Sequence, residues 1–160
     1  PIWFKCRSEE QGVQATIEWL TRGAEKYPGC LSAVLCRSSE DARYAYRLLQ
    51  PTFGPLLRLG DEYSFTFFEG IVVTGVEQVK GLEFTNVLLW NPSAKDYPRD
   101  DVHRNMLYTA ITRAEENLSL VTWSRSSEIL PGFSSPLIRA HDLTVQDEEP
   151  QEPERDRDHE

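Results

Sequence analysis

Two stretches of the sequence decide its interpretation: Val79-Lys80-Gly81-Leu82-Glu83-Phe84 and Leu107-Tyr108-Thr109-Ala110-Ile111-Thr112-Arg113-Ala114. The first follows an apolar run of the kind that forms a buried strand, and its glycine permits a sharp turn. The second has apolar residues at helical spacing and ends on an arginine shortly before another apolar run. A strand, a polar turn, a second strand and an amphipathic helix are parts of a layered α/β domain.

Outward from these stretches, strands are expected to alternate with helices. The alternation predicts a mainly parallel sheet with helices on both faces, a three-layer α/β/α fold. We expect Pro51 to end the second helix. The expected strands are 2–6, 31–36, 71–74, 86–90 and 118–123, with one or two short ones around 56–59 and 65–68; the expected helices are about 9–26, 39–49 and 101–116, and a last ordered piece covers 136–145.

Side-chain spacing predicts which helical faces are buried. In the third helix Val102, Met106, Ala110 and Ala114 recur every four residues and are expected to form the inner stripe. Tyr108 is expected to pack as well. At the start of the first helix, Ser8 with Gln11 three residues later matches a capping box. The second helix is expected to bury Ala42, Ala45, Tyr46 and Leu49.

Composition predicts one domain over residues 1–145 and an acidic, disordered tail over residues 146–160. The chain has 160 residues, and 39% are hydrophobic, which is enough for a packed core. From Asp147 to Glu160 there are eight acidic residues and two arginines, so the tail carries most of the net charge of −9. The remaining body is mildly acidic, which argues against a strong electrostatic clamp on DNA. The tail either keeps the chain soluble or binds a protein partner.

Cysteine and histidine spacing argues against several classes of site. Three cysteines without Cys-x-x-Cys spacing favour a reducing, cytoplasmic setting over a disulfide framework or a metal centre. The three histidines fit no metal or catalytic-triad spacing, which disfavours a self-sufficient α/β hydrolase. No apolar run approaches the ~20 residues of a membrane span. Because the chain starts without Met inside a predicted strand, we expect it to be part of a longer polypeptide.

Taken as chemistry, the two stretches allow more than one interpretation. Glu83 can accept a hydrogen bond from a ribose hydroxyl, a role that acidic residues take in nucleotide sites. Arg113 either forms a salt bridge with a nearby glutamate or acts as an arginine finger on a phosphate. Five aromatic side chains are candidates for stacking on bases, with core packing as the alternative: Phe65, Phe67, Phe68, Trp90 and Tyr97.

The order and spacing of these motifs resemble the second RecA-like lobe of UvrD/Rep-like superfamily 1 DNA helicases. In that family a Lys-Gly-Leu-Glu-Phe turn, a buried strand and a Leu-Tyr-x-Ala-x-Thr-Arg-Ala helix occur in this order. Upstream, Ala33-Val34-Leu35-Cys36-Arg37-Ser38 resembles the family's Ala-Val-Leu-x-Arg-(Ser/Thr) segment. The resemblance covers roughly residues 1–123 and implies a RecA-like fold.

The resemblance also implies roles for individual residues. Arg113 is expected to be the γ-phosphate finger, while Glu83, Gly81 and Arg37 are expected near the nucleotide. Lys80, Gln78 and Thr74 are expected along a track for single-stranded DNA. The implied cofactor is ATP with Mg²⁺, which the first RecA-like lobe would hold, because this sequence has no Gly-x-x-x-x-Gly-Lys-(Ser/Thr) loop. Without that partner lobe the chain is expected to be inactive.

The chain departs from the family pattern at Glu77-Gln78-Val79, where many members have a His-Ser-Ala-type triplet. A carboxylate there would repel phosphate, which puts ordinary contact with a DNA strand in doubt. A second hypothesis therefore stands beside the motor: a non-catalytic protein-interaction module derived from a helicase lobe. Only about 20 residues separate the second helix from the strand at Ile71, which favours the helicase IV-like or RecD-like branches. Repair, recombination and plasmid or phage replication all stay open.

Overall fold

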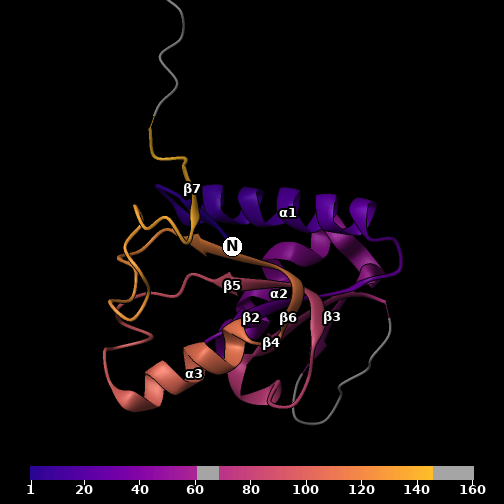
Figure 1. The fold of residues 1–160 in the computed structure, drawn as a ribbon. Coiled ribbons are helices and arrows are strands. Elements are labelled where there is room, and N and C mark those ends of the chain that lie inside the picture. Colours follow the sequence, from indigo (N-terminus) through magenta and orange to yellow (C-terminus); the bar gives the residue numbers. More distant parts are fainter. Residues whose placement is uncertain (61–68, 146–160) are drawn as a thin grey trace, which may run out of the picture.

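The computed structural model describes residues 1–60 and 69–145, and their core is a seven-stranded sheet (Figure 1). The strand order is β3-β4-β2-β5-β6-β1-β7, and every neighbouring pair is parallel. The strands are β1 (Ile2–Lys5), β2 (Leu31–Cys36), β3 (Leu57–Gly60), β4 (Gly70–Gly75), β5 (Phe84–Trp90), β6 (Ala114–Thr122) and β7 (Arg139–Asp142). The expected parallel sheet is confirmed. The short strand expected around 65–68 and the acidic tail lie outside the described residues.

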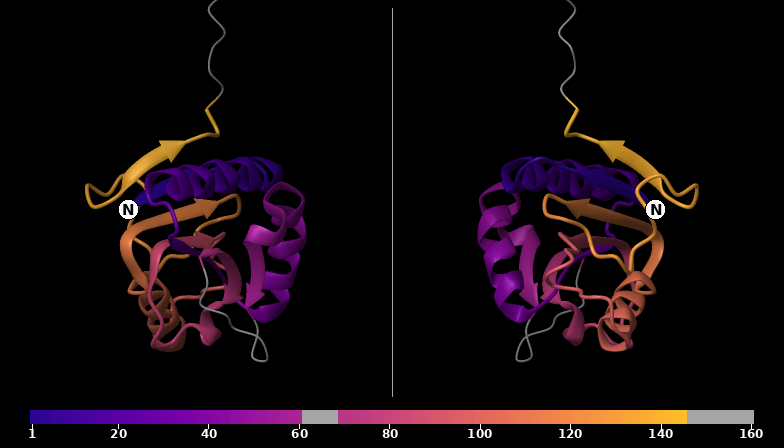
Figure 2. Two further views of the ribbon diagram at one scale, coloured as in Figure 1. Left: turned by 90° about the vertical axis from the view of Figure 1, so that its right-hand side faces the viewer. Right: turned by 90° about the vertical axis from the view of Figure 1, so that its left-hand side faces the viewer.

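Helices cover both faces of this sheet, as Figure 2 shows from two sides. On one face α1 (Glu9–Lys26) and α2 (Ser39–Phe53) pack their buried alanines and leucines against alternate sheet residues such as Val34 and Leu88. On the other face α3 (Asp101–Ile111) packs against the intervening residues, including Leu35 and Leu89. Two 3-10 turns, η1 (Gly54–Leu56) and η2 (Val76–Gln78), complete the described elements. The predicted three-layer α/β/α fold is therefore confirmed.

The central strands are buried on both faces, as their continuous apolar sequences predict. Val34, Val73 and Val87 have no exposed surface. The predicted capping of α1 is also present, because the backbone N–H of Gln11 donates to Ser8 Oγ at 3.2 Å. In the reciprocal bond, the side-chain oxygen of Gln11 accepts from the backbone N–H of Arg7 rather than from that of Ser8.

Two helix ends differ from the sequence prediction. The second helix includes Pro51 and runs to Phe53, and Gly54, with φ of +54°, follows it. The third helix ends at Ile111 rather than about residue 116, because the chain from Ala114 onward pairs with β5. Sheet pairing thus overrides the helical spacing that Ala114 shares with the residues before it.

The buried stripe of α3 is also displaced from its predicted position. Leu107 and Ala110 are buried, and Met106 and Ala114 pack partly against the same core. Val102, in contrast, is 66% exposed and Tyr108 is 68% exposed, so the prediction that both pack inward was wrong. Val102 is exposed because a spacing of four residues drifts around a helix that repeats every 3.6 residues. Tyr108 lies outside that series and next to the buried Leu107, so the helix turns it away from the core.

Two glycines with positive φ allow a stability prediction. Gly81 (φ +83°) has nothing within 4 Å of an added Cβ, whereas a Cβ on Gly70 (φ +122°) would lie 2.7 Å from the backbone oxygen of Leu56. We expect Gly81→Ala to lower the free energy of unfolding by about 1–2 kcal/mol, the cost of left-handed backbone, and Gly70→Ala to lower it further. Urea denaturation of both variants measures the difference. Equal losses would show that the Leu56 backbone moves aside freely.

Candidate functional site

The two motifs meet at the amino-terminal edge of the sheet, where β5 and β6 begin. Phe84 is in parallel register with Ala114, and the Phe84 N–H donates to the Arg113 carbonyl oxygen at 2.8 Å. Glu83 and Arg113, the residues immediately before this pair, are thereby brought onto adjacent strand ends. The fold therefore places the predicted ribose contact next to the predicted finger, although 30 positions separate them in the sequence.

The Lys-Gly motif belongs to a segment, residues 76–83, that crosses from one edge of the sheet to the other. It begins after the carboxyl end of β4 and ends at the amino end of β5. Buried Val76 and Val79 anchor it to the core on the α3 face. Lys80, Gly81 and Glu83 are exposed along it, so the segment presents polar groups while its valines hold the backbone in place. Ligands of open α/β sheets generally bind beyond the carboxyl ends of the strands, and only the start of this segment lies there.

Arg113 is half-buried in the turn between α3 and β6, and its side chain is held by the end of the helix. Its Nε donates to the Thr109 carbonyl oxygen at 3.0 Å, and a terminal nitrogen contacts Thr112 Oγ1 at 3.1 Å. Thr112 Oγ1 itself donates to the carbonyl oxygens of Tyr108 and Thr109, so this threonine supports the end of the helix. Within residues 1–60 and 69–145, Arg113 forms no ion pair with a carboxylate. The salt-bridge interpretation therefore gains no support from the described residues.

Arg37 lies at the opposite, carboxyl-terminal edge, at the end of β2, and not beside Glu83 and Arg113. Its Nε donates to the Asp96 carbonyl oxygen at 3.0 Å, and one terminal nitrogen lies 3.4 Å from His103 Nε2. Its other terminal nitrogen lies 3.9 Å from Glu77 Oε1. The structure therefore separates Arg37 from the predicted nucleotide contacts and pairs it with the glutamate that departs from the family pattern.

The three predicted DNA contacts differ in accessibility. Lys80 is exposed and Gln78 is half-buried. Thr74 has no exposed surface, and its hydroxyl donates to the Gly60 carbonyl oxygen at 2.7 Å. The expectation that the Thr74 side chain contacts DNA is corrected by this burial, because its only hydroxyl is committed to the neighbouring strand.

The aromatic candidates on the described strands and loops are core residues. Trp90 is 7% exposed and Tyr97 is 2% exposed, so neither offers a face for stacking on a base. Burial raises the pKa of the Tyr97 hydroxyl, which keeps that group neutral. Phe65, Phe67 and Phe68 lie outside the described residues.

Other kinds of site find little support in the described part of the chain. No group of three or more His, Cys, Asp or Glu side chains there is placed to hold a metal ion. Burial raises the pKa of the Cys6 thiol to about 11, so this cysteine is unreactive at neutral pH. None of the helices described has the length and apolarity that a bilayer crossing requires.

Sequence reasoning missed the network that holds Arg37. Asp100 caps α3 by accepting from the His103 N–H at 2.8 Å, and the same carboxylate oxygen lies 2.7 Å from His103 Nδ1. His103 in turn contacts Arg37, which links the helix cap to the end of β2. The capping sequence was visible, but the contact with Arg37 depends on how α3 packs.

Comparison with known proteins gives one family match and a set of structural neighbours. Residues 70–121 match the model of the UvrD-like helicase C-terminal domain, which confirms the resemblance over the segment that carries both motifs. No curated protein sequence matches the chain. The remaining comparison is therefore with solved protein structures.

Two solved structures share the fold at low sequence identity. The C-terminal domain of a possible DNA helicase from Lactobacillus plantarum WCFS1 has a TM-score of 0.75 and 24% identity, over 88% of this chain and 84% of that chain. The C-terminal domain of the DEAD-box protein Dbp5 has a TM-score of 0.59 and 12% identity, over 90% of each chain. At these identities the neighbours establish the RecA-like fold alone.

The cap of α3 predicts a pH dependence of stability. Hydrogen bonds from the backbone and ring of His103 lower the pKa of Asp100 in the folded chain. The ionised Asp100 carboxylate therefore contributes fully to the free energy of unfolding above the usual aspartate pKa of about 4. This contribution is lost as the pH falls through the lowered pKa of Asp100 in the folded chain. Asparagine caps equally well but does not titrate. Wild type should exceed Asp100→Asn in stability at pH 7, and the gap should narrow below about pH 4.

Urea midpoints at pH 7, 5 and 3 test this prediction. Asp101→Asn is the matched control, because it removes a charge at the next residue without touching the cap. A gap for Asp100→Asn that stays constant over this range, or the same narrowing in the control, would contradict it.

Proposed function

We propose that the chain is the second motor lobe of an ATP-dependent superfamily 1 DNA helicase. The observation that carries the proposal is the pairing of β5 with β6, which brings Glu83 and Arg113 together inside the segment that matches the UvrD-like family. Alone, neither Glu83 nor Arg113 could contact both the sugar and a phosphate of a nucleotide. Together they offer a hydrogen-bond acceptor for a sugar hydroxyl and a cation for a phosphate.

Arg113 suits the role of a finger because its position is fixed while part of its guanidinium stays available. Two of its five N–H donors are used by Thr109 and Thr112 among the described residues. The remaining donors can meet the oxygens of a phosphate on a facing lobe. A guanidinium supplied from outside the phosphate-binding lobe stabilises the charge that develops in phosphoryl transfer.

The nucleotide itself would be held mainly by the first lobe. This sequence has no P-loop motif, and within residues 1–60 and 69–145 no group of three or more His, Cys, Asp or Glu side chains is placed to hold Mg²⁺. ATP with Mg²⁺ would supply the phosphoryl group and the free energy of hydrolysis. This chain's part would be to orient the ribose through Glu83 and to close Arg113 onto the γ-phosphate. Gly81 would let the turn approach the nucleotide.

DNA would contact the opposite edge of the lobe. Arg37 and Gln78 lie near the carboxyl end of the sheet, and Lys80 follows on the crossing segment. Residues 76–83 therefore connect the proposed DNA contact directly to the proposed nucleotide contact. Through this segment, closure on ATP at one edge would shift the DNA-facing groups at the other. Thr74 would support this edge through its bond to β3 and not touch the strand.

A specific observation favours the second candidate, a protein-interaction module without motor activity. Arg37 already has a carboxylate partner in Glu77, so part of the DNA-facing charge is neutralised within the chain. A partner protein could use this edge or the acidic tail in place of DNA. The motor hypothesis then requires DNA phosphate to compete with Glu77 for Arg37.

The finger is tested by Arg113→Ala in a two-lobe protein that contains a P-loop lobe. We expect DNA-stimulated ATP hydrolysis to fall by about 10³-fold or more, because an arginine finger contributes about 10³–10⁵ to the rate. Arg104→Ala is the matched control, since Arg104 is an exposed arginine on the same helix and pairs with Asp101. Full activity of Arg113→Ala would remove Arg113 from the mechanism. Absence of stimulated hydrolysis in the wild-type protein, with the lobes associated, would favour the interaction module.

The role of Glu77 is tested by Glu77→Gln in a binding titration with single-stranded DNA. Releasing Arg37 should tighten binding about twofold to fivefold, because an exposed ion pair contributes up to about 1 kcal/mol. Arg37→Gln should weaken binding and reduce its salt dependence. Glu10→Gln removes an exposed carboxylate on α1 and serves as the control. Equal affinities of wild type and Glu77→Gln would show that the carboxylate does not compete with DNA.

A further inference from the structure

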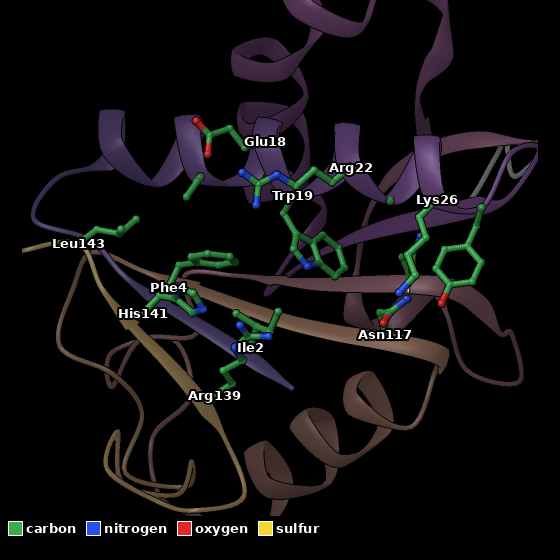
Figure 3. Close-up of a pocket in the computed structure, with 14 residues that line it drawn as sticks. Ile2, Phe4, Glu18, Trp19, Arg22, Lys26, Asn117, Arg139, His141 and Leu143 are labelled. Atoms are coloured by element: carbon green, nitrogen blue, oxygen red, sulfur yellow. Dashed lines mark hydrogen bonds between the residues drawn. The ribbon is translucent and has the colours of Figure 1, made fainter.

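A groove of about 410 Å³ lies between α1 and the strands β1 and β7, on the face of the sheet opposite α3 (Figure 3). Its volume falls within the range of about 300–1,000 Å³ that is typical of ligand pockets. Neither motif contributes to its lining. The residues that the argument uses are Phe4, Trp19, Arg22, Lys26, Arg139 and His141.

Close contacts of α1 with the sheet on either side of the groove fix its position. A Cβ on Gly12 would lie 2.3 Å from a ring carbon of Trp123, and one on Gly23 would lie 2.9 Å from Asn86 Nδ2. The helix therefore rests on the sheet at two glycines 11 residues apart. Between them it carries Trp19 and Arg22, which extend into the space above β1 and β7, as Figure 3 shows.

Aromatic rings line the groove. Parallel register places Phe4 of β1 beside His141 of β7, and their ring centroids are 5.2 Å apart. Trp19 projects from the helix toward the sheet and lines the same groove (Figure 3). All three side chains are only partly buried, so their faces are accessible from the groove. An unstacked base can stack against an accessible ring of this kind, at about 1–3 kcal/mol per base.

Cations surround these rings, although the chain as a whole has a net charge of −9. Arg22, Lys26 and Arg139 line the groove and are exposed, and none has a salt-bridge partner in residues 1–60 and 69–145. Glu18 is the one acidic residue in the lining. A ligand that carries both phosphates and planar rings would complement these cations and the accessible aromatic faces beside them.

We infer that this groove binds a short segment of single-stranded nucleic acid, with Arg22, Lys26 and Arg139 on phosphates and Trp19, Phe4 and His141 against bases. A duplex offers no free base faces to these rings. An acidic peptide would use the cations but not the aromatic surface. The amide of Asn117, which donates to Asn86 Oδ1 at 2.8 Å, lines the same groove and leaves its own oxygen to accept from a base.

This site is separate from the DNA edge in the proposed function and does not depend on it. Val76 and Val79, which carry the crossing segment, pack on the α3 face, whereas Phe4 and Trp19 pack on the α1 face. The sheet lies between the two surfaces. The groove would therefore be a second attachment point for single-stranded nucleic acid, outside the proposed DNA contact at the carboxyl edge.

Titration of the full chain with an oligodeoxythymidine, followed by tryptophan fluorescence, tests the inference. Trp19 emission should be quenched, and Trp19→Phe should remove that change, since Trp3 and Trp90 are buried and the partly buried Trp123 does not line the groove. Changing both Arg22→Gln and Arg139→Gln should weaken binding about tenfold and reduce the salt slope by roughly 1.4, at about 0.7 per phosphate contact. The pair Arg43→Gln and Arg47→Gln on α2 is the matched control, with the same charge change on exposed arginines outside the groove.

Arg37→Gln separates this inference from the proposed function. If Trp19 quenching persists in Arg37→Gln and is lost in the double variant Arg22→Gln, Arg139→Gln, the groove binds the oligonucleotide. This conclusion holds whatever the ATPase assay shows. Binding that depends on Arg37 alone, with no response of Trp19, overturns the groove while the proposed track stands. Equal quenching by duplex DNA, or quenching by polyglutamate but not by the oligonucleotide, also overturns it. Circular dichroism of each variant excludes unfolding as the cause of a loss.

Discussion

The parallel pairing of β5 with β6 is the constraint on which the rest of the arrangement depends. The pairing of Phe84 with Ala114, one residue out of register with the pairs from Asn86 onward, ends α3 at Ile111, starts β6 and fixes Arg113 in the turn between them. The same pairing sets the end of the Lys-Gly segment beside that turn. Slipping the register by one residue would turn every side chain of β6 to the other face, which the buried core on both sides prevents.

Parallel topology also explains why the polar groups fall on two edges and not in one cleft. All strands run the same way, so residues after a strand gather at one edge and residues before a strand gather at the other. Arg37 and Glu77 belong to the first group, and Glu83 and Arg113 belong to the second. Residues 76–83 connect the two groups, since they leave β4 at one edge and enter β5 at the other. The helix α3 also connects them, because His103 contacts Arg37 in its first turn and Arg113 follows its end. A lobe built this way can respond at both edges to one displacement of that segment.

Charge is distributed unevenly over a chain that is acidic as a whole. The exposed carboxylate of Glu77 pairs with Arg37 at the carboxyl edge, while the cations beside α1 have no such partners among the described residues. Net charge therefore says little about where this molecule attracts an anion. The local arrangement of cations and carboxylates decides it, because exposed charges separated by more than about 10 Å are largely screened.

The succession of strands and helices along the chain, the buried central strands and the motif residues could be predicted from the sequence, because burial and local turns leave periodic and compositional signals. Val34 and Val73 are buried as their apolar runs predict, and Gly81 makes the turn that its lack of a side chain permits. The sequence did not reveal that Thr74 is inaccessible, that Arg37 lies apart from Arg113, or that Tyr108 faces outward. These depend on strand order, register and helix rotation, which arise from contacts between residues far apart in the chain. The groove beneath α1 has the same origin, since its lining comes from the two ends of the sequence and its middle.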